Sequence, residues 1–164
     1  MNKHDIPVTQ AIRLLRARNI PFTPHFYEYE EHGGTSLSAS ALGVPEHNVI
    51  KTIVLETNEK RPLIVLMHGD CEISTKTLAR LLGVKSVSPC DPHVATKHTG
   101  YLVGGTSPLG TLKPIPVYAE SSIFALETLY INGGKRGFLI EMHPSDMRKA
   151  LEITEVQVAI PKTP

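Results

Sequence analysis

One segment limits the possible folds more than any other: the nearly unbroken apolar run Val49-Ile50-Lys51-Thr52-Ile53-Val54-Leu55. β-Branched residues dominate this run, which is typical of a strand that is buried on both faces of a sheet. Residues 62–67 repeat the signature and predict a neighbouring strand. We therefore expect a sheet with residues 49–55 as its central strand.

The other elements follow from periodicity and from the residues that start and stop helices. Predicted helices cover residues 6–15, 37–42 (capped by Thr35 or Ser36 and closed by Gly43), 78–82 (preceded by Ser74 and stopped by Gly83), 92–98 and 144–151. Predicted further strands cover residues 25–30, 84–88, a stretch at Val117, 128–131, 138–142 and 156–160. Because some adjacent strands have no helix between them, we expect an α/β fold of the α+β type, with a mixed sheet wrapped by helices. A length of 164 residues fits a single domain over residues 1–164.

The composition excludes several classes of protein. Seventeen basic and sixteen acidic residues give a net charge of +1, so any contact with RNA must be local, and DNA is not an expected partner. Cys71 and Cys90 form no CxxC pair, which argues against a disulfide framework and for a reducing cytoplasm. The polar start, Met1 to Asp5, and the lack of an apolar run of roughly 20 residues predict a soluble cytoplasmic protein with no signal peptide and no membrane partner.

Lys51 interrupts the apolar central strand. A buried ammonium costs several kcal/mol unless it meets an anion or water, so its side chain is expected to reach a wet cleft. The alternative is a lysine on an edge strand whose amine extends to solvent.

Residues 100–110 contain four glycines and a proline. Glycines allow successive amide N–H groups to converge on one point, as in an oxyanion hole for an ester carbonyl, although a surface turn has the same composition. The segment matches neither GxGxxG nor GxxxxGK[ST], so a nucleotide site of either kind is not expected.

A second glycine-rich motif, Asn132-Gly133-Gly134-Lys135-Arg136-Gly137, lies between two predicted strands. Its glycines favour a tight hairpin, and its two basic side chains could hold phosphates. The alternative is a solvated hairpin tip.

Other catalytic signatures are missing from the sequence. The eight histidines show no HExxH or other metal spacing, and no serine lies in a GxSxG motif. No metal and no cofactor are therefore expected. The sequence offers an oxyanion trap without an evident nucleophile.

This combination resembles the YbaK/prolyl-tRNA-synthetase-associated editing family. The motifs that carry the resemblance follow in the family's order: Tyr27, Lys51-Thr52, Thr99-Gly100-Tyr101-Leu102-Val103-Gly104-Gly105 with Ser107-Pro108-Leu109-Gly110, and Gly133-Gly134-Lys135-Arg136-Gly137. The resemblance implies a single domain with a curved mixed sheet. It also implies a trans-editing deacylase that hydrolyses the ester of mischarged tRNA, commonly Cys-tRNA(Pro), with prolyl-tRNA synthetase as a possible partner in delivery.

The resemblance also implies roles for individual residues. Lys51 would meet the substrate's backbone or the phosphate of the terminal adenosine, and Gly104 and Gly105 would present amides to the scissile carbonyl. The substrate's own thiol would attack the ester, or water would attack with help from a ribose hydroxyl. The substrate-binding residues are expected to be Tyr27, Thr52, Tyr101, Thr106, Ser107, Pro108, Asn132, Gly133, Lys135 and Arg136, with Arg13 or Arg16 as further candidate contacts to tRNA.

Two departures leave the amino acid open. Residues 31–36 lack the Phe-Gly-Asp segment of the YbaK branch, and Asn132 stands where serine is usual. A deacylase for another mischarged tRNA, such as Ala-tRNA(Pro), and a non-catalytic module that binds tRNA or a partner protein are the alternatives. A nucleotide-phosphate hydrolase that uses Lys135 and Arg136 is a third, which the absence of an acidic metal cluster in the sequence disfavours.

Overall fold

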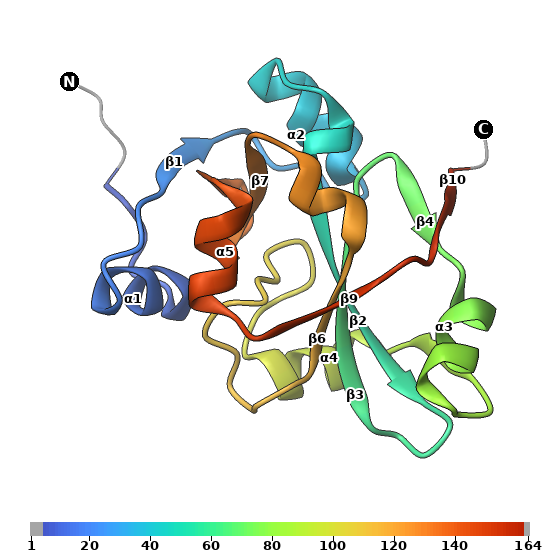
Figure 1. The fold of residues 1–164 in the computed structure, drawn as a ribbon. Helices are drawn as coiled ribbons and strands as arrows, with labels where there is room; N and C mark the ends of the chain where they lie inside the picture. Colours follow the sequence, from blue (N-terminus) through green and yellow to red (C-terminus); the bar gives the residue numbers. More distant parts are fainter. Residues whose placement is uncertain (1–4, 163–164) are drawn as a thin grey trace.

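The predicted central strand lies in the middle of the sheet. In the computed structural model, which describes residues 5–162, β2 (Val49–Thr57) pairs antiparallel with β3 (Pro62–His68) from Ile50 to Glu56. The sheet runs in the order β1-β8-β7-β2-β3-β6-β9, with β5 also paired to β2 (Figure 1). The remaining bounds are β1 (Thr23–Phe26), β5 (Val87–Pro89), β6 (Val117–Glu120), β7 (Leu129–Lys135), β8 (Phe138–Met142) and β9 (Ile153–Val156).

Parallel and antiparallel pairs occur in the same sheet, as the sequence predicts. β2 runs parallel to β7, β3 to β6, and β6 to β9, whereas the other pairs are antiparallel. A separate two-stranded sheet joins β4 (Cys71–Ile73) to β10 (Ala159–Pro161). The helices are α1 (Gln10–Ala17), α2 (Gly34–Leu42), α3 (Thr75–Leu82), α4 (Pro92–Thr99) and α5 (Pro144–Ala150), with 3-10 turns η1 (Glu46–Asn48) and η2 (Ser121–Ala125).

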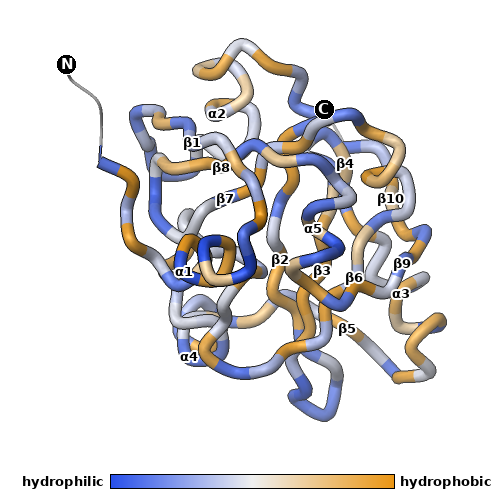
Figure 2. The backbone as a smooth tube through the Cα atoms, turned by 60° about the vertical axis from the view of Figure 1, so that its left-hand side comes forward, coloured by the Kyte–Doolittle hydropathy of each residue, from blue (hydrophilic) through white to orange (hydrophobic). Residues whose placement is uncertain are grey.

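The unbroken apolar run from Leu63 to Met67 in β3 reflects burial on both faces. Ile64 and Leu66 point into one core with α1 and α5, whereas Leu63, Val65 and Met67 point into a second core with α3. All five are at most 3% exposed. The backbone coloured by hydropathy shows β3 as an apolar segment (Figure 2). Alternate side chains of one strand therefore serve two cores, and no polar face remains.

Several predicted boundaries were wrong for local reasons. The first helix begins at Gln10 rather than near Ile6, because the side chain of Thr9 caps it by accepting from the N–H of Ile12. α2 begins at Gly34, and its N-terminus has no side-chain cap, so Thr35 and Ser36 do not act as caps. The two helices closed by Gly43 and Gly83 end as expected, with both glycines left-handed.

Three predicted strands also shift. The strand expected over 25–30 ends at Phe26, where its pairing with β8 ends. The strand expected over 84–88 is found at Val87–Pro89, and the one expected over 156–160 is split between β9 and β10. Met1–His4 of the polar start lie outside the described residues. Across residues 5–162, every helix is too short or too polar to traverse a lipid bilayer.

Candidate active site

The central strand has one open stretch along its edge. β7 pairs with β2 only at Val49 and Ile50, and β5 pairs with it only from Leu55 to Thr57. The carbonyl of Val54 accepts from the N–H of Cys90 at 3.0 Å on this side. Because main-chain groups alternate in direction along a strand, the N–H and C=O of Thr52 also face this open edge.

A cavity of about 530 Å³ lies along this edge, within the usual range for small-molecule sites. Its walls come from β2, the start of α2, the start of α4, the glycine-rich segment and the β7–β8 hairpin. Of the residues predicted for the site, the cavity brings together Tyr27, Lys51, Thr52, Gly104, Thr106, Asn132 and Arg136. Tyr101, Gly105, Ser107, Pro108, Gly133 and Lys135 are not among its lining residues.

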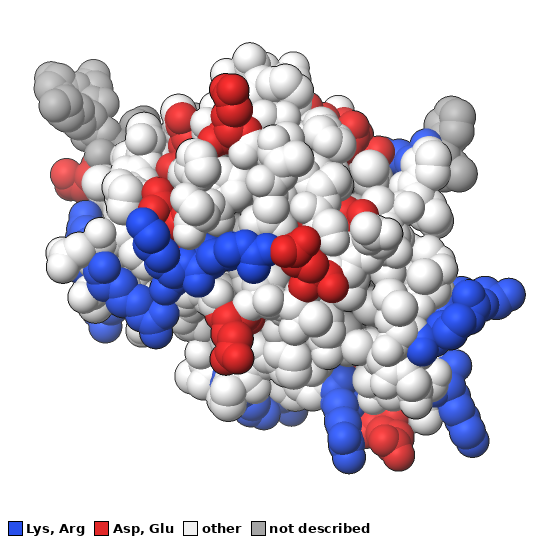
Figure 3. Space-filling view, in the orientation of Figure 1, with Lys and Arg blue, Asp and Glu red and all other residues white. Residues whose placement is uncertain are grey.

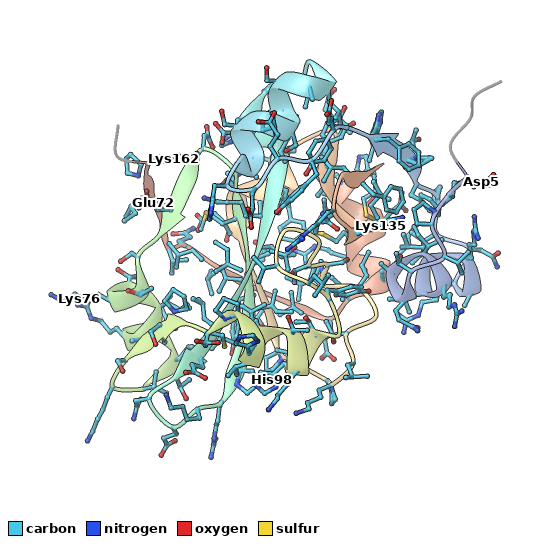
Figure 4. All side chains as sticks on the ribbon, turned by 180° about the vertical axis from the view of Figure 1, so that it is seen from behind. Asp5, Glu72, Lys76, His98, Lys135 and Lys162 are labelled. Atoms are coloured by element: carbon cyan, nitrogen blue, oxygen red, sulfur yellow. The ribbon has the colours of Figure 1, made fainter. Side chains whose placement is uncertain are left out.

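Lys51 is half-buried in the cavity wall. Its Nζ donates to the carbonyl oxygen of Cys71 at 2.5 Å, which directs the amine toward the start of β4. Burial lowers the pKa of Lys51, and repulsion from the amine of Lys162 adds to the shift. Lys162 lies close to Glu72 beside this strand (Figure 4). An ammonium has three donors, so two remain for a ligand.

Thr52 contributes a hydroxyl that the protein leaves unused. Its Oγ1 is buried, and no hydrogen-bond partner for it lies within residues 5–162. A buried hydroxyl without a partner costs free energy, roughly 1–3 kcal/mol on protein scales. Because the oxygen has almost no accessible surface, a substrate atom would offset that cost only after a shift of the cavity wall.

Gly104 forms the point where the glycine-rich segment meets the cavity. Its φ is +91°, and a Cβ there would lie 2.4 Å from the hydroxyl oxygen of Tyr29. The left-handed backbone favours glycine here, and any other residue would also have to displace the Tyr29 side chain. Among the described residues, no hydrogen-bond partner accepts from the Gly104 N–H.

Gly105 does not present its amide to the cavity, which corrects the sequence-based expectation for this residue. Its N–H donates to the carbonyl of Leu102 at 2.9 Å within the segment. A Cβ at Gly105 would lie 2.8 Å from the backbone nitrogen of Arg136. This glycine therefore allows the segment to pack against the β7–β8 hairpin.

The residues around Gly104 hold the segment in shape. The hydroxyl of Tyr101 donates to the carbonyl of Leu109 at 2.6 Å, and Ser107 Oγ accepts from the N–H of Leu109 at 3.1 Å. Tyr101, Ser107 and Pro108 are buried away from the cavity. Burial raises the pKa of Tyr101 to about 12. These residues support the segment and do not line the cavity.

The β7–β8 hairpin clamps the glycine-rich segment from the other side. Asn132 Nδ2 donates to the carbonyl of Gly104 at 3.2 Å, and Arg136 Nε donates to the carbonyl of Val103 at 2.9 Å. The Arg136 guanidinium also lies over the Tyr29 ring, 5.2 Å from its centroid. Gly133 packs directly on Phe138, and Lys135 is exposed. The two glycine motifs thus form one unit around the cavity mouth.

Tyr27 lines the cavity, and burial raises its pKa, with a further contribution from Tyr29. Tyr29 also lines the cavity and was not predicted from the sequence, although two tyrosines spaced by two in an extended chain share one face.

Cys90 and Ser38 also line the cavity without any motif to mark them. Burial raises the Cys90 pKa to about 11, with the Glu56 carboxylate adding to the shift, so this thiol is a poor nucleophile.

The sequence around the cavity also matches a known protein family. Residues 31–150 match the family model described as the aminoacyl-tRNA editing domain. The chain belongs to this family. The matched range contains most of the cavity wall, including Lys51, Gly104 and Asn132.

Relatives of this editing domain occur as separate proteins and as parts of synthetases. EbsC of Enterococcus faecalis, named "Putative Cys-tRNA(Pro)/Cys-tRNA(Cys) deacylase", is 29% identical over 92% of this chain and 91% of its own length. A proline–tRNA ligase of Brachyspira hyodysenteriae is 33% identical over 54% of this chain, but that match spans only 15% of the ligase. A crystal structure of "a putative trans-editing enzyme for prolyl tRNA synthetase" superposes with a TM-score of 0.80 at 17% identity, covering 96% of this chain and all of that one.

Basic side chains gather over α1 and α5 on the face shown in Figure 3. Most of these side chains already interact with other residues of the chain. Arg18 donates to the carbonyl of Ala150, Arg148 pairs with Glu155, and Lys149 pairs with Asp146. Arg13 and Arg16 are exposed and form no ion pair with any residue from 5 to 162.

Proposed function

We propose that this chain is a trans-editing aminoacyl-tRNA deacylase that acts on Cys-tRNA(Pro). One observation carries the proposal: Lys51, Thr52 and Gly104 line the same cavity, which is large enough for an aminoacyl ester and its adenosine. EbsC, which is named as a deacylase of Cys-tRNA(Pro) and Cys-tRNA(Cys), supports the choice of substrate by its similarity along nearly the whole chain.

In the proposed reaction the enzyme supplies position and charge stabilisation. The thiol sulfur of the cysteinyl group attacks the ester carbonyl, the bond to the ribose oxygen breaks, and that oxygen takes up the thiol proton. The amino acid leaves as a cyclic thioester, which water then opens to free cysteine. The N–H of Gly104 donates to the carbonyl oxygen as it becomes an oxyanion. Loss of one such donor typically costs about 10²–10³ in rate. The Lys51 amine binds the substrate's backbone or the phosphate of the terminal adenosine through its two remaining donors.

No side chain of the protein acts as nucleophile in this scheme. The raised pKa of Cys90 fits that assignment, because a protonated thiol does not compete with the substrate's thiol. Proximity alone can then supply much of the rate, since it turns attack into an intramolecular step.

The test is deacylation of a panel of mischarged tRNAs by the purified full chain. We expect release of cysteine from Cys-tRNA(Pro) and little release of alanine from Ala-tRNA(Pro), because alanine has no thiol. Equal cleavage of both substrates would replace thiol attack with attack by water, assisted by a ribose hydroxyl, and would make Ala-tRNA(Pro) a substrate. A panel left intact would reject the deacylase.

A non-catalytic module that binds tRNA ends or a partner protein is the second candidate. The hydrogen bond of Lys51 to Cys71 and that of Gly105 to Leu102 favour it, because both use donors that catalysis could employ. This candidate predicts tRNA binding that does not depend on Lys51, without hydrolysis. Measured turnover would exclude it.

Delivery of the tRNA belongs to the same proposal. A net charge of +1 predicts weak binding of tRNA by the chain alone, so prolyl-tRNA synthetase is the proposed partner that brings the substrate. Arg13, Arg16, Lys135 and Arg136 are the proposed contacts to phosphates. Few such contacts give a shallow dependence of affinity on salt, which a titration at several salt concentrations measures.

A further inference from the structure

Three side chains with metal-binding atoms meet outside the cavity, between η1 and the turn that links β3 to β4. His47 Nδ1 lies 2.9 Å from Asp70 Oδ1, and the Cys71 sulfur lies 3.6 Å from the same oxygen. One ligand atom from each of the three residues lies within 4.8 Å of the others. Sequence motifs for metal sites do not detect this group, because it forms only when the fold brings residue 47 next to residues 70 and 71.

We infer that His47, Asp70 and Cys71 form a site for a divalent transition metal of the Zn²⁺ type. Zinc binds nitrogen and oxygen at about 2.0–2.2 Å and sulfur at about 2.3 Å in a tetrahedron, which separates ligand atoms by roughly 3.3–3.6 Å. The separations from Asp70 to His47 and to Cys71, 2.9 and 3.6 Å, require shifts of only a few tenths of an ångström. The third separation, between the His47 nitrogen and the Cys71 sulfur, is at most 4.8 Å and has to shorten to about 3.6 Å on binding. Water would complete the coordination.

The ligand types select this class of metal. Imidazole, thiolate and carboxylate together suit zinc, whereas calcium and magnesium prefer oxygen alone. Binding displaces two protons. The Cys71 thiol releases its proton to solvent and becomes a thiolate, and the proton between His47 Nδ1 and Asp70 moves to His47 Nε2 or to solvent, which frees Nδ1 for the metal. The local charge also favours a cation, since the carboxylates of Glu46, Asp70, Glu72 and Glu120 outnumber the amines of Lys51 and Lys162.

Surrounding groups hold the ligands in place. The His47 ring stacks on the His68 ring with centroids 3.7 Å apart and planes within 6°. His68 Nδ1 lies 2.7 Å from the carbonyl of His47, which can only accept, so this nitrogen carries the proton. The other nitrogen of His68 is 2.7 Å from the hydroxyl of Ser122. The carbonyl of Cys71 is held by Lys51. Such outer contacts are the usual support of a metal site.

The experiment uses the full chain, stripped of metal with a chelator and titrated with Co²⁺ and then Zn²⁺. We expect one equivalent of Co²⁺ to produce a thiolate-to-metal charge-transfer band. Cys71→Ser removes that band and weakens Zn²⁺ binding by about tenfold or more. Cys90→Ser is the matched control and retains both signals. A saturating excess of Zn²⁺ raises the Tm of the original protein by about 5 °C or more but not that of Cys71→Ser.

Two further variants keep the test decisive. The His47 side chain is 45% exposed, so we expect His47→Gln to fold. It supplies the same comparison if Cys71→Ser does not fold. Asp70→Asn is expected to weaken Zn²⁺ binding as well. The inference is overturned if the charge-transfer band survives in Cys71→Ser and is lost in Cys90→Ser, or if Zn²⁺ binds the original protein and His47→Gln equally.

Discussion

The side chain of Asn132 joins the two glycine motifs, because its Nδ2 donates to the carbonyl oxygen of Gly104 at 3.2 Å. Its Oδ1 meanwhile accepts from the N–H groups of Gly134 and Lys135, at 2.6 and 3.1 Å. One amide therefore shapes the β7–β8 hairpin and fixes the carbonyl of the glycine that lines the cavity.

Replacing this amide should loosen the glycine-rich segment. Asn132→Ala removes the bond to Gly104, and we expect deacylation of Cys-tRNA(Pro) to fall about tenfold, equivalent to roughly 1.4 kcal/mol of barrier. Asn58→Ala is the matched control, because Asn58 Oδ1 also accepts from two backbone N–H groups, those of Lys85 and Ser86, away from the cavity. Equal losses in both variants would assign the effect to general loss of stability.

Thr52 allows the separation of binding from folding. Thr52→Val removes a buried hydroxyl that has no partner among the described residues, so the free energy of unfolding should stay the same or increase. Activity should fall if the hydroxyl meets substrate. Thr57→Val is the contrast: Thr57 Oγ1 accepts from the N–H groups of Glu59 and Arg61, and its loss should cost about 1–3 kcal/mol in urea unfolding. A large destabilisation by Thr52→Val would show that its hydroxyl has a structural partner.

Two left-handed glycines test whether Gly104 is required for space as well as conformation. Gly83→Ala adds a Cβ to open space at φ +70°, so only backbone strain, on the order of 1–3 kcal/mol, is expected. Gly104→Ala adds the same strain at φ +91° and a clash with Tyr29. We expect it to lose more stability than Gly83→Ala and most of the deacylase activity. Equal unfolding midpoints for the two variants would refute the clash.

The thiol of Cys90 gives a prediction about pH. In a Cys71→Ser background, where Cys90 is the remaining cysteine, alkylation by iodoacetamide should be slow near neutral pH and accelerate as pH rises toward about 11. The raised pKa also means that the folded state keeps the proton longer than the unfolded state. The resulting stabilisation is complete below pH 9 and is lost as pH rises from 9 to about 11. Rapid labelling at neutral pH would contradict the raised pKa.

The central strands were predictable because their burial leaves a direct trace in the sequence. Both faces of β3 are covered, so every position between Leu63 and Met67 must be apolar. The start of α1 was not predictable from periodicity, since Ile6 and Val8 continue its apolar pattern while Thr9 supplies the cap. Boundaries thus depended on single hydrogen bonds that a hydrophobic pattern does not record.

The candidate site was predictable only where its chemistry is unusual for its surroundings. Lys51 could be selected because a lysine in an apolar strand needs a reason, and Gly104 because glycines cluster around it. The sequence could not distinguish Gly104 from Gly105, because both lie in the same glycine-rich motif. Only the structure shows that the N–H of Gly105 donates to the carbonyl of Leu102. The position of Cys90 in the cavity wall could not be predicted from the sequence. It depends on the open edge of β2, which exists only between the stretches that pair with β7 and with β5.

The most direct test of the proposed function is the single-turnover rate of Cys-tRNA(Pro) deacylation by Lys51→Ala beside Lys76→Ala. Lys76 is an exposed lysine of α3 that does not line the cavity (Figure 4). We predict that Lys51→Ala loses most of the rate, on the order of 10²-fold, while Lys76→Ala retains the original rate and both proteins unfold at similar urea concentrations. Undiminished deacylation by Lys51→Ala would contradict the assignment of this cavity as the active site.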